Sequence, residues 1–368
     1  GIRGINKLLK KQCKTGISNI DIKKLRNKHI GIDTSIYLYK YTYIGNMLEC
    51  FLKQIEHLLS YGITPIYFFD GKPSEEKMKL IEQRNDTHNK ALDKINKMKK
   101  ELEDLENIED PTDEILFRIQ EMELGISKKE KGTIRINKNE LGDLKIILKN
   151  LGIYYYECDG EADIYMKVFS QNKLVDYVIT EDLDFLTHGC KNTLYNYSYS
   201  SSKMSLYNLE KVLKDLELSY ESFVDLCIML GCDYSCKIPG FGPITGYKLI
   251  TEYNSFSELS EKSKIKVPIH FKYTDSLNMF IESPEILIKN KKDLNLKKEN
   301  INLEILKELN LNPQILNSFN KKRIKKMSNI STDKNSERLV FLVITNRHDN
   351  YFLKISPSII ISTKEETN

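Results

Sequence analysis

Three short apolar segments that each run into an acidic residue constrain the fold of this chain more than any other feature. They are residues 28–33, 63–70 and 177–182. Amphipathic helical patterns lie between them, at residues 47–61 and 140–151. Continuous apolar strands that alternate with helices predict an α/β domain whose largely parallel central sheet is flanked by helices. Ligands gather beyond the carboxyl ends of the strands in such sheets, and each of the three segments has an Asp at that end.

A highly charged segment, residues 77–136, interrupts this alternation. Its apolar side chains recur at steps of three and four among many Lys and Glu: Leu92, Ile95, Met98, Leu102 and Leu105. This spacing predicts a long amphipathic helix. Asp110 as a cap and Pro111 at the first helical position predict a second helix. We therefore expect a projecting α-hairpin, which either binds a partner or covers an active site.

Composition narrows the protein class only modestly. The formal net charge of the 368 residues is +4, which leaves a nucleic-acid partner open, because a basic track can lie beside an acidic pocket. No apolar run approaches the roughly 20 residues of a membrane span, so no membrane association is expected. The seven scattered cysteines suggest no disulfide framework, which favours a reducing, intracellular location.

Seven carboxylates stand out by their positions: Asp33, Asp70, Glu161, Asp163, Asp182, Asp184 and Asp233. Carboxylates packed together repel and raise each other's pKa, and divalent cations remove that penalty. Hard oxygen ligands favour Mg²⁺ or Mn²⁺, and a pair of such ions activates water and neutralises the leaving oxygen of a phosphodiester. A single Asp after a strand more often caps a helix, but four separate segments that converge on one sheet edge favour a metal site.

A glycine-rich segment, residues 238–249, follows a predicted short helix at residues 220–230. Its glycines are Gly240, Gly242 and Gly246. No strand precedes them, so this is not the dinucleotide fingerprint. The pattern fits a helix-hairpin-helix turn, in which the backbone and the next helix N-terminus grip a DNA phosphate. Thr245 and Lys248 join the glycines as candidate DNA-binding residues, and the alternative is an ordinary connection between helices.

Over residues 1–327, the chain resembles the flap-endonuclease/XPG (Rad2-like) family of structure-specific 5′ nucleases. The blocks that carry the resemblance occur in order, and the glycine-rich segment follows them: GIRGI (1–5), IDTS (32–35), FFDGKP (68–73), GEAD (160–163), TEDLDFL (180–186) and LGCDY (230–234). The resemblance implies a PIN-like nuclease domain with an inserted helical arch. It also implies a pair of Mg²⁺ ions, replaceable by Mn²⁺, held by the seven carboxylates.

The resemblance also implies roles for single residues. The interval to Asp182 pairs Glu161 and Asp163, rather than Asp159 and Glu161, with the family's ligand pair. Lys77 and Arg84, seven residues apart and so on one helical face, would contact the scissile phosphate, while Asp182 and Asp184 would act in catalysis. Tyr39 would stack on a substrate base, and the Gly1 amine would lie near the site.

The implied organisation divides the chain into five parts. Residues 1–76 and 137–235 form the nuclease domain, 77–136 the arch, 236–327 the helix-hairpin-helix region, and 328–368 a tail without an assigned role. The short stretch between Asp33 and Asp70 implies a trimmed wedge between duplex arms, which leaves the preferred junction open. The tail lacks the glutamine-plus-aromatic motif for a sliding clamp, so clamp binding is unsupported.

The expected function is a Mg²⁺-dependent, structure-specific 5′ flap endonuclease and 5′–3′ exonuclease of DNA replication, repair or recombination. It would act as a monomer on branched or flapped DNA, leaving a 5′-phosphate and a 3′-hydroxyl. The alternatives are a Holliday-junction resolvase of the same superfamily, a non-catalytic binder of branched DNA and an RNA-cleaving relative. Richness in Lys, Asn and Ile suggests an AT-rich genome, so the nucleus of a cell and a viral replication site both remain open.

Overall fold

The centre of the molecule is a seven-stranded mixed sheet. A computed structural model describes residues 1–108, 112–133, 135–263, 265–281, 345–347 and 350–352. The strands of the sheet are β1 (Ile17–Asp21), β2 (His29–Asp33), β3 (Thr64–Phe69), β4 (Tyr154–Glu157), β5 (Tyr177–Ile179), β6 (Asn192–Tyr195) and β7 (Lys203–Asn208). Their order is β1-β7-β6-β5-β2-β3-β4. Strands β2 to β6 run parallel, while β1 and β7 pair antiparallel at one edge.

This arrangement confirms the predicted α/β domain and adds strands that the sequence did not reveal. The three predicted apolar segments become β2, β3 and β5, which are neighbours in the order β5-β2-β3. Because they are parallel neighbours, their carboxyl ends meet at one edge of the sheet. Strands β1, β4, β6 and β7 were not predicted.

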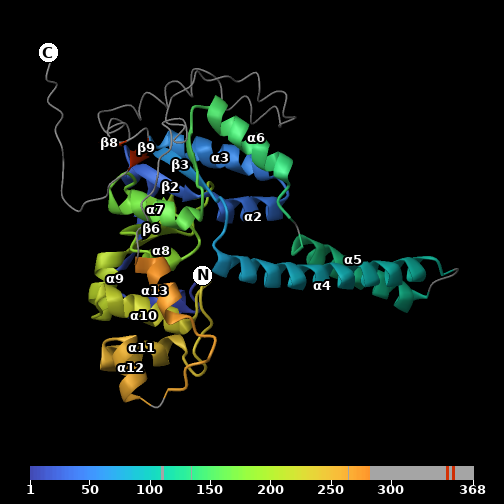
Figure 1. Cartoon of the computed structure of the whole chain (residues 1–368). Coiled ribbons are helices and arrows are strands. Elements are labelled where there is room, and N and C mark those ends of the chain that lie inside the picture. The colour runs from blue at the N-terminus through green and yellow to red at the C-terminus, as the bar shows by residue number, and fades with distance from the viewer. Residues whose placement is uncertain (109–111, 134, 264, 282–344, 348–349, 353–368) are drawn as a thin grey trace.

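Helices cover both faces of the sheet, and further helices project beyond it in two directions (Figure 1). They are α1 (Ile5–Gln12), α2 (Thr34–Ile44), α3 (Met47–Ser60), α4 (Glu75–Glu106), α5 (Asp113–Lys131), α6 (Lys138–Asn150), α7 (Ala162–Gln171), α8 (Asp184–Thr187), α9 (Leu209–Leu216), α10 (Tyr220–Leu230), α11 (Pro243–Tyr253), α12 (Phe256–Lys262) and α13 (Tyr273–Ile281). A short 3₁₀ helix spans Ile22–Leu25, and β8 (Thr345–Arg347) pairs with β9 (Asn350–Phe352).

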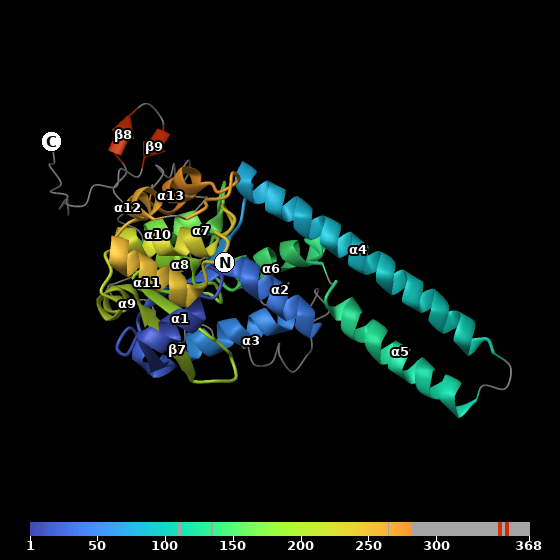
Figure 2. The same ribbon diagram turned by 90° about the horizontal axis from the view of Figure 1, so that it is seen from below.

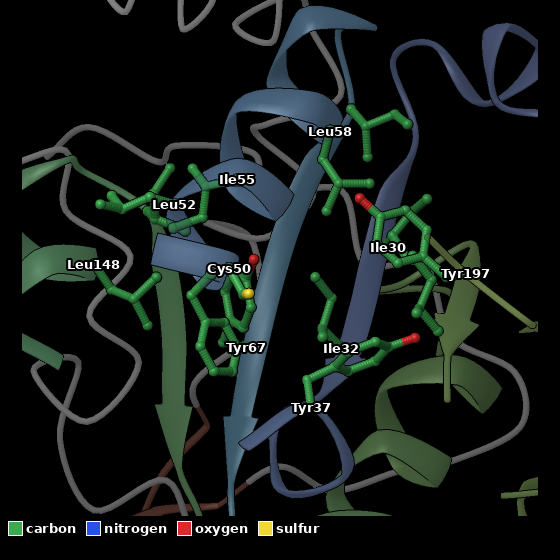
Figure 3. Close-up of a cluster of buried hydrophobic side chains, with 14 of the residues drawn as sticks. Ile30, Ile32, Tyr37, Cys50, Leu52, Ile55, Leu58, Tyr67, Leu148 and Tyr197 are labelled. Carbon is green, nitrogen blue, oxygen red and sulfur yellow. The ribbon is translucent and has the colours of Figure 1, made fainter. Parts of the chain in front are cut away.

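Alternation along the strands divides the core between the two faces of the sheet. In β3, Tyr67 and Phe69 pack with α2, α3 and α6, whereas Ile66 and Phe68 pack with α7 on the other face. Figure 3 shows the first of these clusters, with Tyr67 beside side chains of α3 and β2. All these residues are almost fully buried, as expected when helices cover both faces of a sheet. The buried sheet is therefore a rigid base for residues at its carboxyl edge.

The charged insertion forms the predicted α-hairpin, which projects from the body (Figure 2). Ile95 of α4 and Ile126 of α5 are buried between the two helices, and Lys99 Nζ lies 2.6 Å from Glu130 Oε1. The predicted start of the second helix is wrong: α5 begins at Asp113, because Thr112 caps it by accepting a hydrogen bond from the Ile115 amide. Asp110 and Pro111 lie outside the described residues.

The region after the sheet is helical and begins with α9, which directly follows β7. Asp225 of α10 accepts hydrogen bonds from the Phe256 amide (2.8 Å) and the Tyr273 hydroxyl (2.6 Å), which ties α12 and α13 to α10. Residues 282–327, including the basic run at 321–326, and most of the tail lie outside the described residues. Of the helices that the structure describes, none is long and apolar enough to cross a membrane.

Candidate active site

One pocket of about 520 Å³ opens at the carboxyl edge of the sheet. Six of the seven predicted carboxylates line it, and with them Tyr39, Lys77 and Arg84: the six are Asp33, Asp70, Asp163, Asp182, Asp184 and Asp233. Most of the remaining lining comes from α2, α4 and α6, including Ile36, Ile81, Leu141 and Lys145, and Phe69, Ile136 and Tyr234 complete it. The pocket therefore lies between the acidic sheet edge and the foot of the α4–α5 hairpin.

The carboxylates are fixed by the elements that carry them. Asp33 ends β2 and caps α2, and its Oδ2 accepts a hydrogen bond from the Thr180 hydroxyl at 2.9 Å. Asp70 follows β3; its Oδ1 accepts from the Ala162 amide at 2.8 Å, and its Oδ2 accepts from the Ser35 hydroxyl. Each oxygen of these two carboxylates accepts one hydrogen bond, so each keeps a second lone pair that can accept from, or bind to, a group in the pocket.

The amino group of Gly1 lies among three of these carboxylates. Its nitrogen is 2.8 Å from Asp233 Oδ1, 3.1 Å from Asp184 Oδ2 and 3.4 Å from Asp182 Oδ2. The Ile2 amide donates to Asp184 Oδ1 at 2.9 Å. Burial lowers the pKa of this amino group, but the three negative charges outweigh burial and raise it to about 11. The expectation that Gly1 lies near the site therefore agrees with the geometry.

The first segment of the chain also approaches the glycine-rich turn closely. Gly4 has a φ of +72°, and a Cβ at this position would lie 2.6 Å from Pro243 Cγ at the start of α11. Any other residue would meet both the strained left-handed backbone and this contact. Gly4 therefore allows the N-terminal segment, whose Gly1 lies among the carboxylates, to pack closely against the start of α11.

Glu161 corrects the expectation that all seven carboxylates face one hollow. It does not line the pocket, because three donors from neighbouring elements hold its side chain. Lys77 Nζ and the Tyr234 hydroxyl each donate to Oε2 at 2.9 Å, and the Ser74 hydroxyl donates to Oε1 at 2.7 Å. Asp159, the alternative ligand, is exposed and also lies outside the lining, whereas Asp163 lines the pocket.

Burial and crowding act against negative charge at several of these groups. Burial, with the charge of Asp70, raises the pKa of Asp33 to about 7. Burial also raises the pKa values of Asp163 and Asp184 well above the ordinary range. Asp182 differs: burial would raise its pKa, but a hydrogen bond with Asp184 and the Gly1 ammonium lower it to about 2. The carboxylates of the site therefore repel one another when they are ionised, and bound cations would relieve this repulsion.

The donor chemistry fits Mg²⁺. Within the described residues, no group of three or more acidic, His or Cys side chains is arranged so that it could hold a metal ion as it stands. Two cationic groups of the chain itself, however, sit among the carboxylates. The Gly1 ammonium contacts Asp182, Asp184 and Asp233. Lys77 Nζ lies 2.9 Å from Glu161 Oε2 and 3.8 Å from Asp163 Oδ2. Oxygen-only ligands that already attract positive charge suit hard divalent cations.

The predicted cationic pair lies on the pocket side of α4. Lys77 is one turn into the helix, and Asp163 and Glu161 raise its pKa against the opposing effect of burial. Arg84 is more open, with a side chain 61% exposed and its Nη2 at 3.6 Å from Asp233 Oδ1. Both side chains therefore place a cationic group beside carboxylates of the pocket.

The helix-hairpin-helix region has the predicted order, with α10, a turn and α11. Gly240 has a φ of +81°, and among the described residues no other part of the chain comes within 4 Å of a Cβ added at Gly240 or Gly242, so the turn is open there. Thr245 and Lys248 are exposed on α11. Gly246, the third candidate glycine for DNA binding, is buried, and a Cβ there would lie 3.1 Å from Leu226 Cδ1. Its role is close packing of α11 on α10.

Sequence reasoning missed residues that support the site. Ser74 caps α4 and at the same time holds Glu161. Tyr234, which follows Asp233, reaches Glu161 from the other side. Ser74 at a helix start was detectable as a cap, but its second bond depends on a residue 87 positions away.

Comparisons with known proteins agree with this geometry. Residues 1–91 match the family model of the XPG N-terminal domain, and residues 152–233 match that of the XPG I-region. Flap endonuclease 1 of Cryptosporidium muris (strain RN66) is 31% identical over 339 residues, which cover 84% of this chain and 68% of that protein. Flap endonuclease 1 of Encephalitozoon cuniculi (strain GB-M1) is 29% identical over 303 residues, 78% of this chain and 82% of the relative.

Solved structures show the same fold at lower sequence identity. Flap endonuclease-1 from Methanococcus jannaschii superposes with a TM-score of 0.61 at 20% identity, covering 91% of this chain and 100% of that one. The catalytic core of Rad2 in complex with DNA substrate gives a TM-score of 0.59 at 16% identity, covering 89% and 99%. Human GEN1 in complex with Holliday junction DNA gives 0.58 at 16% identity, covering 90% and 77%.

Proposed function

Because this chain belongs to the flap endonuclease/XPG family of nucleases, we propose that it cuts branched or flapped DNA at the carboxylate pocket in a metal-dependent reaction. One observation carries the proposal. Six Asp side chains from distant parts of the chain line the same pocket as Lys77 and Arg84. Negative groups that bind metal thus lie beside positive groups that bind phosphate, as hydrolysis of a phosphodiester requires.

The proposed roles follow from position. Asp33, Asp70, Asp163, Asp182, Asp184 and Asp233 hold a pair of Mg²⁺ or Mn²⁺ ions, and Glu161 contributes from the edge of the site. The bound ions supply an acidified water and positive charge next to the scissile phosphate. Lys77 and Arg84 orient that phosphate and stabilise the charge that develops on it. Tyr39, 62% exposed at the pocket, stacks on a base of the substrate.

The rest of the molecule positions the DNA. The open turn at Gly240 and Gly242 and the start of α11 grip a duplex phosphate, and Thr245 and Lys248 add contacts from the same helix. The α4–α5 hairpin, residues 77–136, stands over the path of a 5′ single strand. We further propose that the protein acts as a monomer in replication, repair or recombination, in the nucleus or at a viral replication site.

Activity on defined DNA structures tests this proposal. With Mg²⁺, we expect cleavage of a labelled 5′-flap duplex that leaves a 5′-phosphate, and no cleavage in EDTA. The same panel holds a four-way junction, a recessed 5′ end and a single-stranded RNA. If the protein cuts the four-way junction in preference to the flap, the proposed flap endonuclease activity is wrong and a resolvase activity takes its place. Binding without cleavage of any structure would show a non-catalytic DNA-binding protein.

The grip at α11 predicts a salt-dependent effect. Removing Lys248 in a Lys248→Ala variant deletes one exposed cation, so duplex affinity should fall about equally for unrelated sequences. The slope of log K against log salt should become shallower by roughly one if Lys248 neutralises one phosphate. Fluorescence anisotropy at several salt concentrations measures both. Glu252→Ala, an exposed substitution on the same helix, is the control, and an unchanged slope for Lys248→Ala would exclude this contact.

A further inference from the structure

Helix α2 carries four tyrosines at alternate positions, and they divide between two environments. Tyr37 and Tyr41 are buried, at 0% and 2% exposure. Their rings lie 5.5 Å apart, and Tyr41 also packs on Phe51 at 5.0 Å. Tyr39 and Tyr43, in contrast, are 62% and 56% exposed. Residues four apart lie on the same helical face, so α2 presents one aromatic pair to the core and one to solvent.

The exposed pair continues outward from the pocket. Helix α2 begins directly after Asp33, and Tyr39 is part of the pocket lining. Tyr43 lies one turn further along, roughly 6 Å at a rise of 1.5 Å per residue, and thus further from the carboxylates. In both views one end of α2 lies close to the body-side end of α5 (Figures 1 and 2). Gly45, with a φ of +90°, ends it just beyond Tyr43.

We propose that Tyr43 is a second stacking platform, which holds an unpaired base next to the one that Tyr39 holds. The proposal rests on the proposed DNA-cleaving function and adds a binding subsite to it. An exposed aromatic ring presents a flat apolar face that every base can cover, and stacking of this kind tolerates any sequence. Continuity with the pocket through Tyr39 places this face on the path of the substrate.

The separation of Tyr39 and Tyr43 along α2 determines whether paired or unpaired nucleotides can contact both rings. Successive bases in a duplex strand rise about 3.4 Å, whereas Tyr39 and Tyr43 are displaced by roughly 6 Å along α2. Two neighbouring bases therefore reach both rings only after they have come apart from each other. A strand that has left its duplex meets this condition, and an intact duplex does not. Tyr43 thus favours substrates with at least two unpaired nucleotides beside the cut.

Substitutions at Tyr43 separate ring stacking from simple apolar contact. The substrates are a duplex with a 5′ single-stranded arm, carrying 2-aminopurine at either of the first two unpaired positions, and a fully paired duplex. Binding is measured in EDTA and single-turnover cleavage in Mg²⁺. We expect Tyr43→Ala to bind the armed DNA about tenfold more weakly, the size expected for one lost base–ring stack. The change in 2-aminopurine fluorescence on binding should also be lost at one position only.

Three further variants complete the test. Tyr43→Phe keeps the ring and should restore binding, whereas Tyr43→Leu keeps apolar area without a ring and should not. Ile44→Ala removes a neighbouring apolar side chain that is also 56% exposed, and should change neither signal. The inference is overturned if the Tyr43→Ala variant binds the armed DNA as tightly as the parent does. It is also overturned if Tyr43→Leu binds this DNA as tightly as Tyr43→Phe, or if Tyr43→Ala weakens binding of the fully paired duplex to the same extent. Failure of the parent protein to cut any DNA would instead overturn the proposed function.

Discussion

An Asp182→Ala variant should lose cleavage of a 5′-flap substrate almost completely while it keeps its affinity for DNA. Asp182 lies at the sheet edge between β5 and α8 and has the lowered pKa that keeps it charged. Removing this carboxylate takes away a metal ligand at the centre of the site. We expect single-turnover cleavage in Mg²⁺ to slow by about a thousandfold or more, equivalent to about 4 kcal/mol of barrier. DNA affinity should stay the same or rise, because a negative charge near the phosphates is lost.

Two further variants test whether the loss of cleavage is specific to carboxylates that line the pocket. Asp184→Asn keeps the shape of a buried side chain that accepts a bond from the Ile2 amide, and should also inactivate the enzyme. Asp159→Ala removes an exposed carboxylate from the loop before α7, outside the pocket lining, and should cut normally. Thermal melting would confirm that all three fold. If Asp182→Ala cuts flaps as fast as the parent, the pocket is not the catalytic site.

Lys77→Ala should slow the cleavage step much more than it weakens DNA binding. Its ammonium lies between Glu161 and Asp163 on the pocket side of α4, where it can reach a phosphate held by the metal site. Loss of one charge that stabilises a transition state costs roughly a hundredfold or more in rate. Arg84→Ala should act in the same direction, and single-turnover rates at saturating enzyme measure both effects apart from affinity.

Controls on the same helix distinguish catalysis from general DNA attraction. Lys100, on α4 and exposed, lies 23 positions after Lys77, roughly 35 Å along the helix. Lys100→Ala should leave the single-turnover rate unchanged. Glu161 keeps its bonds from Ser74 and Tyr234 in Lys77→Ala, so the pocket should keep its shape. If Lys77→Ala and Lys100→Ala behave alike, Lys77 contributes only to binding.

The fold was predictable where its signal is local. Strands β2, β3 and β5 are buried on both faces, and their sequences are therefore continuous apolar runs. The long α4 and its partner α5 follow from the spacing of apolar residues in a charged segment. Strands β1 and β7 were not predictable because they are partly exposed and mix apolar with polar residues, without a continuous apolar run. Their pairing joins Ile17 to Tyr207, and no local pattern encodes a partner so far along the chain.

The strand pattern of the sequence was enough to predict that Asp33, Asp70 and Asp182 lie near one another. Parallel strands align their carboxyl ends, so acidic residues at or just after the ends of β2, β3 and β5 share an edge. How each side chain is used depends instead on contacts between distant segments. Glu161 turns to Lys77, Ser74 and Tyr234 instead of the pocket, and Gly246 is buried against Leu226. Such choices depend on which donors and side chains fill the remaining space, and packing of distant segments sets that space.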